Sequence, residues 1–369
     1  MTQIGRDITS PALMGWCKLR PRQAYVPTGD AASPYGWSWQ AAPSAAGPDN
    51  TIYMSDYANS TAGVQGAIDD AANKMLVWDC ARTVTGTVTV SNPTHILGIG
   101  ANATVEGAGS EDDRGIATLI ASGNLDPLID IASDGVTVDD VLFDGDASSS
   151  TLMRWACKYG RILGCEFKYA SVGLELINQW DYTNIIQCRL MAGLTKAIQI
   201  DLNHGSSYNN AHTIILGCHL SATSECVDRV AGGSGTAYDF RFIGCDFHDG
   251  HDVNYMLDMS NLHYSTFTNC NFELHATTPP GVGVVYCEAI GLAFHGCLFG
   301  GRNIGAMTCL VGGSYEPIDV SGSTFANWYA GQTLMSGVDF ANVDSCNFYN
   351  TAAATVIAGG ARRGDHAWT

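Results

Sequence analysis

A four-residue phrase, Gly-Cys-x-Phe, recurs through most of this chain and constrains its fold more than any other feature. It stands at 164–167, 244–247 and 296–299, and close variants end at Leu220, Phe272 and Phe348. With the last residue of the phrase as an anchor, nine anchors follow one another at steps of 23 to 30 residues: Phe143, Phe167, Leu190, Leu220, Phe247, Phe272, Phe299, Phe325 and Phe348. A repeat of this length with variable insertions is typical of a solenoid, in which each coil contacts only its neighbours.

The segments between the anchors predict strands and turns rather than helices. Short apolar runs such as 174–177, 197–200 and 284–287 lack the apolar period of 3.6 that a helix requires. Within each phrase the Cys and the Phe or Leu are two residues apart, so they share one face of a strand, and the residue between them faces the other way. We therefore predict an all-β fold, a right-handed parallel β-helix, with cysteines and anchors in two internal stacks.

The composition agrees with many short strands and tight turns. The chain has 42 glycines, and only 15% of its residues are charged. Its net charge of −18 would repel nucleic acid phosphates and anionic membranes, so we expect no nucleic acid partner. It contains no apolar run long enough for membrane insertion and no recognisable secretion signal. Thirteen cysteines form an odd set, and we expect most of them to be reduced and buried as small apolar side chains.

Four segments follow from these patterns. Residues 1–55 are rich in Pro, Gly, Ala and Ser and predict an extended arm that packs on another molecule, with simple disorder as the alternative. Residues 56–80 contain one amphipathic helix over 63–75 and a first strand, and the helix is expected to cap the open end of the stack. The β-helix is predicted over 81–358, followed by a short tail at 359–369.

Three segments of the first coils carry a family resemblance. The helix 64–71, the turn Gly98-Ile99-Gly100 and the strand 136–145 resemble the start of the pectate-lyase-like β-helices of bacteriophage tailspikes, and the resemblance covers about residues 60–355. It implies a homotrimer in the phage tail that binds, and in many members cleaves, a bacterial cell-surface polysaccharide. It further implies synthesis in the host cytoplasm, extracellular action at the host surface, and attachment to the tail, baseplate or an adaptor through the amino-terminal arm.

Acidic residues recur at nearly the coil period and are the candidate catalytic groups. Strand alternation predicts an outward row at steps of 26 to 30 residues, formed by Glu175, Asp201, Asp228, Asp258 and Glu288. Glycoside hydrolysis needs one protonated and one ionised carboxyl group, and neighbouring coils about 5 Å apart would supply both. The preferred pair is Asp201 and Asp228, with Asp258 and Glu175 as further catalytic candidates. Ordinary solvated surface is the alternative for each of these acids.

Aromatic and amide side chains near this row are the candidate sugar-binding groups, because a pyranose offers an apolar face and a rim of hydroxyls. These side chains could instead pack against a neighbouring subunit. Together with Glu288, the substrate-binding candidates are Trp180, Tyr182, His204, Tyr208 and Tyr238.

Other chemistries have weaker signals. The cluster His248-Asp249-Gly250-His251-Asp252 could bind a metal, but a polar turn explains it as well, so we predict neither a metal nor a cofactor. A polysaccharide lyase would need a base and a cationic group such as Arg154 or Arg229. The sequence therefore favours a glycan hydrolase, with a non-catalytic fibre or adhesin and a lyase as the alternatives.

Overall fold

The computed structural model describes most of the chain and separates it into two units, Met1–Thr51 and Ile52–Thr369. In the first unit, β1 (Gln23–Pro27) pairs antiparallel with β2 (Trp37–Ala41). The described residues are 23–27, 37–41, 50–99, 117–203, 210–230, 235–249, 255–274, 283–301, 308–312, 318–328, 331–337, 340–349, 355–358 and 361–363.

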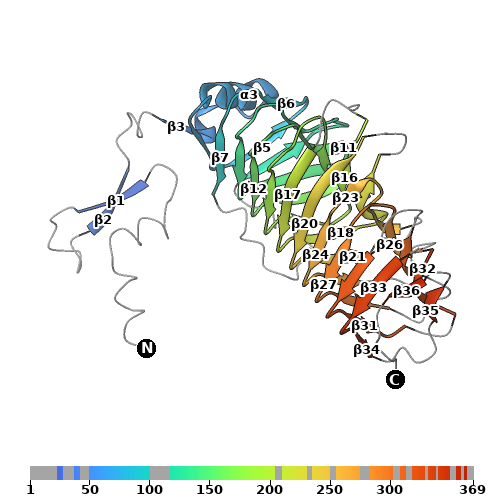
Figure 1. Cartoon of the computed structure of the whole chain (residues 1–369). Helices are drawn as coiled ribbons and strands as arrows, with labels where there is room; N and C mark the ends of the chain where they lie inside the picture. Colours follow the sequence, from blue (N-terminus) through green and yellow to red (C-terminus); the bar gives the residue numbers. More distant parts are fainter. Residues whose placement is uncertain are drawn as a thin grey trace. The chain divides into compact units, whose positions relative to one another are not determined.

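The second unit is a right-handed parallel β-helix, as predicted, whose strands form three rows that run along the stack from blue to red in Figure 1. The first row is one 14-stranded sheet: β3 (Thr51–Tyr53), β4 (Met75–Trp78), β7 (His95–Gly98), β10 (Thr137–Asp139), β12 (Arg161–Leu163), β14 (Asn184–Ile186), β17 (Asn210–Leu216), β20 (Ala237–Ile243), β23 (Leu262–His263), β24 (Thr266–Thr268), β27 (Ala293–His295), β30 (Ile318–Ser321), β33 (Phe340–Asp344) and β36 (Ala361–Arg363).

The two remaining rows are joined where β11 (Leu142–Trp155) and β13 (Glu166–Leu176) run through both. The anchor row also holds β5 (Ala81–Val84), β8 (Thr118–Ala121), β15 (Arg189–Leu190), β18 (His219–Ala222), β21 (Asp246–Asp249), β25 (Asn271–Glu273), β28 (Leu298–Gly300), β31 (Thr324–Ala326) and β34 (Asn347–Tyr349). The acidic row holds β6 (Val88–Val90), β9 (Ile129–Ile131), β16 (Lys196–Ile200), β19 (Glu225–Arg229), β22 (Tyr255–Asp258), β26 (Gly283–Cys287), β29 (Thr308–Gly312), β32 (Thr333–Ser336) and β35 (Thr355–Ala358).

The predicted anchors occupy one continuous column of the anchor row. Each of the nine is the register partner of the next, from Phe143 paired with Phe167 to Phe325 paired with Phe348. The rings of Phe272 and Phe299 stack with centroids 4.7 Å apart, close to the spacing of paired strands. A second internal ring column comes from the first row, where the centroids of Phe242 and Phe267 lie 4.6 Å apart. The repeat therefore places the core as the sequence predicts.

The cysteines of the described residues are all free, and most are buried, as expected. Each phrase cysteine points its thiol at backbone carbonyl oxygens of its own strand corner; the Sγ of Cys188, for example, lies 3.4 Å from the Ile186 oxygen. Burial raises the pKa of the fully enclosed Cys287 and Cys309 thiols. These thiols therefore act as small packing groups and are poor nucleophiles.

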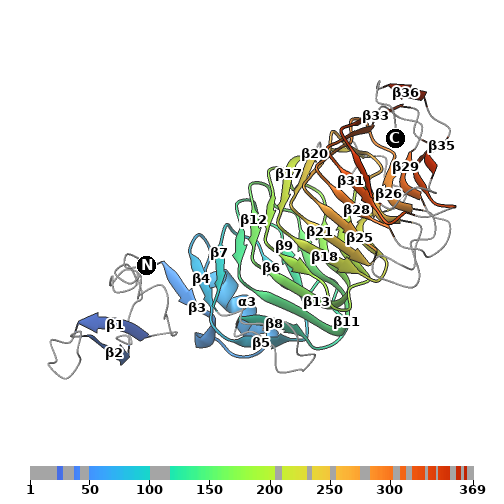
Figure 2. The ribbon, with the colours of Figure 1, turned by 90° about the horizontal axis from the view of Figure 1, so that it is seen from below.

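The helix α3 (Thr61–Asp70) follows the short 3₁₀ helix η1 (Met54–Asp56) and packs against β5 and β6 at the amino-terminal end of the β-helix (Figure 2). Its predicted inward residues, Val64, Ala67 and Ile68, are buried. The helix begins two residues before its predicted start, because the Ser60 side chain caps it by accepting the Gly63 N–H. No helix among the described residues combines the length and apolar character needed to cross a membrane.

The β-helix extends beyond the predicted limits at both ends. The first row begins with β3, inside the segment predicted as the arm, and continues with β4, which is the first strand predicted within 56–80. It ends with β36, which pairs in parallel with β33 inside the segment predicted as the tail. Backbone hydrogen bonds, rather than the anchor phrase, define these outer strands, so a search for the phrase alone misses them.

A left-handed backbone conformation marks the corner before each phrase. Gly164, Gly217 and Gly244 have φ near +60°, and Asn269 has φ +52° at the matching place one coil later. No atom lies within 4 Å of a Cβ built on Gly244, so only the backbone conformation restricts this position. We expect Gly244→Asn to change the free energy of unfolding by less than about 1 kcal/mol, because Asn tolerates this conformation, and Gly244→Val to lose about 1–2 kcal/mol or more. Denaturant unfolding checks this, and equal losses for both variants would contradict it.

Candidate functional site

Strands of the acidic row carry two successive inward residues, so their outward positions lie three residues apart. In β19, Cys226 and Val227 are both buried in the core between Glu225 and Asp228. The same pattern recurs in β16, where Ala197 and Ile198 point into the core. The side chains of this row therefore do not simply alternate between the core and the outside. Each strand instead contributes two outward residues, and these form two outward columns across the row.

Register defines the members of these columns. The first column runs through Arg154, Glu175, Gln199, Asp228, Asp258 and Tyr286. The second runs through Val172, Lys196, Glu225, Tyr255 and Gly283. Polar and aromatic side chains of both columns meet on β16, β19, β22 and β26.

Two predicted members of the acidic row lie elsewhere. Asp201 follows the end of β16, and its Oδ1 accepts the Asn203 N–H at 2.7 Å, while Gln199 is the register partner of Asp228. Glu288 lies two residues beyond Tyr286, which is the partner of Asp258. The predicted pairing of Asp201 with Asp228 is therefore wrong, because the loop lengths between coils shift the true rung by two residues.

The Asp228 side chain is instead paired with Glu225, which simple alternation did not reveal. The two carboxyl groups share a hydrogen bond. The Oδ2 of Asp228 also accepts from Lys196 Nζ and from Gln199 Nε2, each at 2.6 Å. Asp228 is buried, and the Lys196 ammonium lies 3.9 Å from Glu225. Asp228 thus accepts two charge-assisted or polar hydrogen bonds beside a carboxyl group whose pKa is raised.

The pKa of Glu225 is raised to about 7. Burial is the largest cause, the neighbouring Asp228 and Asp258 charges raise the pKa further, and Lys196 opposes them. A carboxyl group that titrates near neutral pH is suited to donate a proton to a leaving oxygen. The pair is therefore the strongest candidate for acid–base chemistry in the described residues.

This raised pKa makes stability depend on pH. Between the ordinary pKa of an unfolded glutamate and about pH 7, the folded state holds the proton more tightly, so the free energy of unfolding falls as the pH rises through this window. Between about pH 5 and about pH 8 we expect the wild-type protein to lose on the order of 1–2 kcal/mol more than Glu225→Gln, after allowance for solvent screening. Urea unfolding at both pH values measures this, and identical pH dependence in the two proteins would contradict it.

Tyrosines continue the site on the carboxy-terminal side of the pair. The rings of Tyr255 and Tyr286 stack with centroids 4.7 Å apart. The Tyr286 hydroxyl donates to Glu288 Oε2 at 2.6 Å, so Glu288 orients this ring. Asp258 Oδ1 accepts from the Ser260 N–H and hydroxyl at 2.9 and 2.6 Å. A partly exposed pair of aromatic rings thus adjoins the carboxyl groups of Asp258 and Glu288.

On the amino-terminal side, Arg154 neutralises the predicted catalytic residue Glu175. Arg154 Nε donates to Glu175 Oε2 at 2.7 Å, and its Nη2 lies 3.3 Å from Asp126 Oδ1. Burial raises the pKa of Asp130, which is the register partner of Arg154. Glu175 is therefore held in an ion pair with Arg154.

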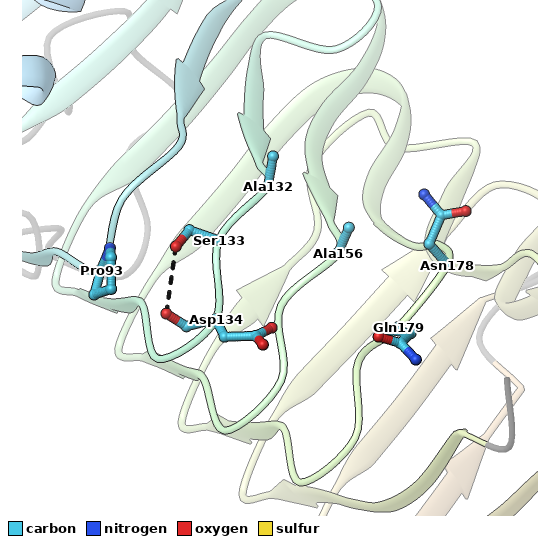
Figure 3. A pocket seen from close by; sticks show the side chains of 7 residues that line it. All are labelled: Pro93, Ala132, Ser133, Asp134, Ala156, Asn178 and Gln179. Carbon is cyan, nitrogen blue, oxygen red and sulfur yellow. Dashed lines mark hydrogen bonds between the residues drawn. The ribbon is translucent and has the colours of Figure 1, made fainter.

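A shallow pocket of about 590 Å³ lies just after the ends of β9, β11 and β13 (Figure 3). Its wall combines small and polar side chains from three neighbouring coils and Pro93, and the Ser133 hydroxyl donates to the Asp134 backbone oxygen. The pocket contains none of the residues of the Glu225 pair. Its lining residues are Pro93, Ala132, Ser133, Asp134, Ala156, Asn178 and Gln179.

The predicted sugar-binding residues separate into three groups. Trp180 is fully buried, so it cannot stack on a sugar, and that prediction is wrong. Tyr182 is 48% exposed and stacks between Tyr159 and His212, at the corner before the first row. Tyr238 lies on β20 of the first row and accepts a hydrogen bond from Thr236. His204 and Tyr208 lie outside the described residues.

Comparisons place the fold, and only the fold, among known proteins. No family model and no curated protein matches the sequence. The Streptococcus pneumoniae surface adhesin PfbA is 12% identical, with a TM-score of 0.56 over 84% of this chain and 93% of its own. The A-module of the Azotobacter vinelandii mannuronan C-5 epimerase AlgE6 is 11% identical, with a TM-score of 0.55 over 85% of this chain and 100% of its own.

A viral protein shares the same fold. ORF18 of Geobacillus virus E2 is 14% identical, with a TM-score of 0.53 over 92% of this chain, and this chain spans 66% of its length. These identities are too low to carry an activity from one protein to another. This protein is thus similar in architecture to a viral protein, a bacterial surface adhesin and a module of a mannuronan C-5 epimerase.

Proposed function

We propose that this protein is a tailspike-like receptor-binding protein that binds a bacterial surface polysaccharide along the acidic row and hydrolyses it with Glu225 as the general acid. The observation that carries the proposal is the hydrogen-bonded pair of Glu225 and Asp228, in which Glu225 has a pKa of about 7. The pair lies beside the stacked rings of Tyr255 and Tyr286 on neighbouring strands.

Glu225, Asp228 and Asp258 have three different roles in the proposed hydrolysis. Glu225 gives its proton to the glycosidic oxygen as the bond from that oxygen to the sugar breaks. Asp228, held by Lys196 and Gln199, keeps Glu225 oriented and protonated. Asp258 is the carboxylate that activates water, because it lies one strand further and three residues along from Glu225. That placement puts their backbones about 11 Å apart. Two acids at this spacing leave room for a water molecule between them, which favours inversion over retention of the anomeric centre.

The charges of the site favour hydrolysis over elimination. A lyase needs a cationic group free to stabilise the enolate of a uronate. Arg154 and Lys196 are both bound to carboxylates, Glu175 and Asp228. A polyuronate would also meet repulsion from Asp228 and Asp258, so we assign the protein a neutral or amino-sugar glycan.

The setting of the activity follows from the same proposal. A viral protein of the same fold supports a place in a phage tail, where the protein acts outside the cell that made it. We propose that the β-helices assemble as a homotrimer and that residues 1–55, with the β1–β2 pair, attach the trimer to the tail, the baseplate or an adaptor.

Incubation of the purified protein with capsular polysaccharide, O-antigen and exopolysaccharide preparations tests the activity. New reducing ends in one preparation, without unsaturated ends, are the expected result. Unsaturated ends would identify a lyase and overturn the mechanism. Binding without shortening would identify the non-catalytic alternative, which the adhesin of the same fold makes the nearest competitor.

A further inference from the structure

A second cluster of polar side chains lies on the anchor row. His219 on β18 is the register partner of Asp246 on β21, and His248 stands two residues after Asp246 on the same strand face. The imidazole rings of His219 and His248 stack with centroids 4.7 Å apart. The donor atoms of the three side chains all lie within 4.8 Å of one another.

We propose that His219, Asp246 and His248 bind one divalent transition-metal ion of the zinc class, which links two successive coils. Two imidazole nitrogens and one carboxylate oxygen suit zinc and its neighbours, and they are poor ligands for calcium or magnesium. A tetrahedral ion with bonds of about 2.0–2.2 Å needs donor atoms about 3.3 Å apart. The three side chains are only partly buried, so their side-chain torsions can turn the stacked imidazole rings and the carboxylate toward one ion.

The groups around the cluster support a cation. Glu273, the register partner of His248, has its Oε2 3.8 Å from His248 Nδ1, where it can orient that imidazole. Asn271 is the neutral partner of Asp246 on the next strand. The opposing charge is Arg189, which is the partner of His219 on the preceding strand. Two carboxylates against one guanidinium leave the local balance negative.

This site goes beyond the proposed hydrolase. It lies on strands of the anchor row, whereas Glu225 and Asp258 lie on the acidic row. The isolated phrase around His248 did not reveal it, because His219 comes from the preceding coil. A bound ion that links coils stabilises the folded state by an amount that rises with the logarithm of its concentration above Kd, independently of any glycan.

Cobalt(II) titration of the untagged full-length protein in a non-thiol reductant tests the proposal directly. We expect one equivalent to bind and to develop visible d–d absorption without the near-ultraviolet charge-transfer band of a thiolate ligand. Zinc should displace the cobalt and raise the Tm of the protein in a concentration-dependent way. A thiolate band would assign the ion to cysteines instead and would overturn the proposal, as would the absence of stoichiometric binding.

Variants complete the test. His248→Ala and the near-isosteric Asp246→Asn should each weaken cobalt binding by about 100-fold or more, without changing the Tm measured in chelator. The matched control is His295→Ala on the first row, where His295 pairs with Ser321 at 2.7 Å, and it should bind cobalt like the wild type. If a cluster variant keeps its metal-free Tm and also keeps wild-type affinity, the assignment is wrong.

Discussion

Replacing Glu225 by glutamine is expected to slow glycan cleavage by about 10²- to 10⁴-fold, the usual contribution of a general acid. Glutamine keeps the shape of the side chain and can still hydrogen-bond to Asp228, but it has no proton to give to the leaving oxygen. The affinity for the polysaccharide should change little, so the effect falls on kcat rather than on KM. Reducing-end assays at saturating glycan, together with binding measured on the inactive variant, separate the two.

Asp139→Asn is the matched control for this result. Asp139 is a half-buried carboxyl group on β10 of the first row, and burial raises its pKa too. Its replacement should leave cleavage at the wild-type rate, because it lies on a different row. If Glu225→Gln retains more than about a tenth of the wild-type rate, Glu225 is not the proton donor.

Phe272→Ala should cause the largest loss of stability among single core substitutions in the column, about 3–5 kcal/mol in the free energy of unfolding. Its ring stacks between Phe247 and Phe299 at 4.9 and 4.7 Å and also meets Phe267 and Phe294 of the second ring column. Truncation therefore leaves a cavity bordered by four rings. Urea unfolding followed by tryptophan fluorescence measures the loss.

Phe348→Ala, at the far end of the same column, provides the comparison. Its side chain is only partly buried, and it stacks on Phe325 at 5.4 Å. The loss should be less than half of that for Phe272→Ala, because fewer neighbours lose contact and water can fill the space. Equal losses at both positions would show that the column is not the main source of stability.

The core was predictable from sequence because the anchor phrase contains its own register. In each copy of the phrase the Cys and the Phe or Leu are two residues apart, so insertions between coils cannot change which face they share. All nine anchors pair in the predicted order. The phrase also fixes the corner, since the residue before the cysteine adopts a left-handed conformation at Gly164, Gly244 and Asn269.

The acidic row was less predictable because it breaks strand alternation. Asp228 and Asp258 are correctly placed on one column, but coil lengths alone cannot separate Gln199 from Asp201. A better signal was present in the sequence. Polar or aromatic residues flank two apolar ones in Lys196–Gln199, Glu225–Asp228 and Tyr255–Asp258, and that spacing of three identifies Glu225.

Sequence patterns could not predict which side chains at the corners point into the core. Trp180 and Tyr182 are both aromatic and only two residues apart, yet the first is buried and the second is half exposed. Tyr182 has φ +57°, which turns its side chain away from the core. Such a conformation depends on hydrogen bonds to the next coil, here from the Tyr182 N–H to the Ala211 oxygen, and these contacts are not written in the local sequence.

The column of buried, free cysteines can report the order in which the coils of the β-helix unfold. Cys165, Cys188, Cys218, Cys245, Cys270 and Cys297 each belong to a different coil and are shielded by the coils on either side. Because a solenoid can open locally from its ends, each thiol meets an alkylating reagent only when its own coil has separated. The order in which these sulfurs become modified therefore shows the direction in which the coils separate along the axis of the β-helix.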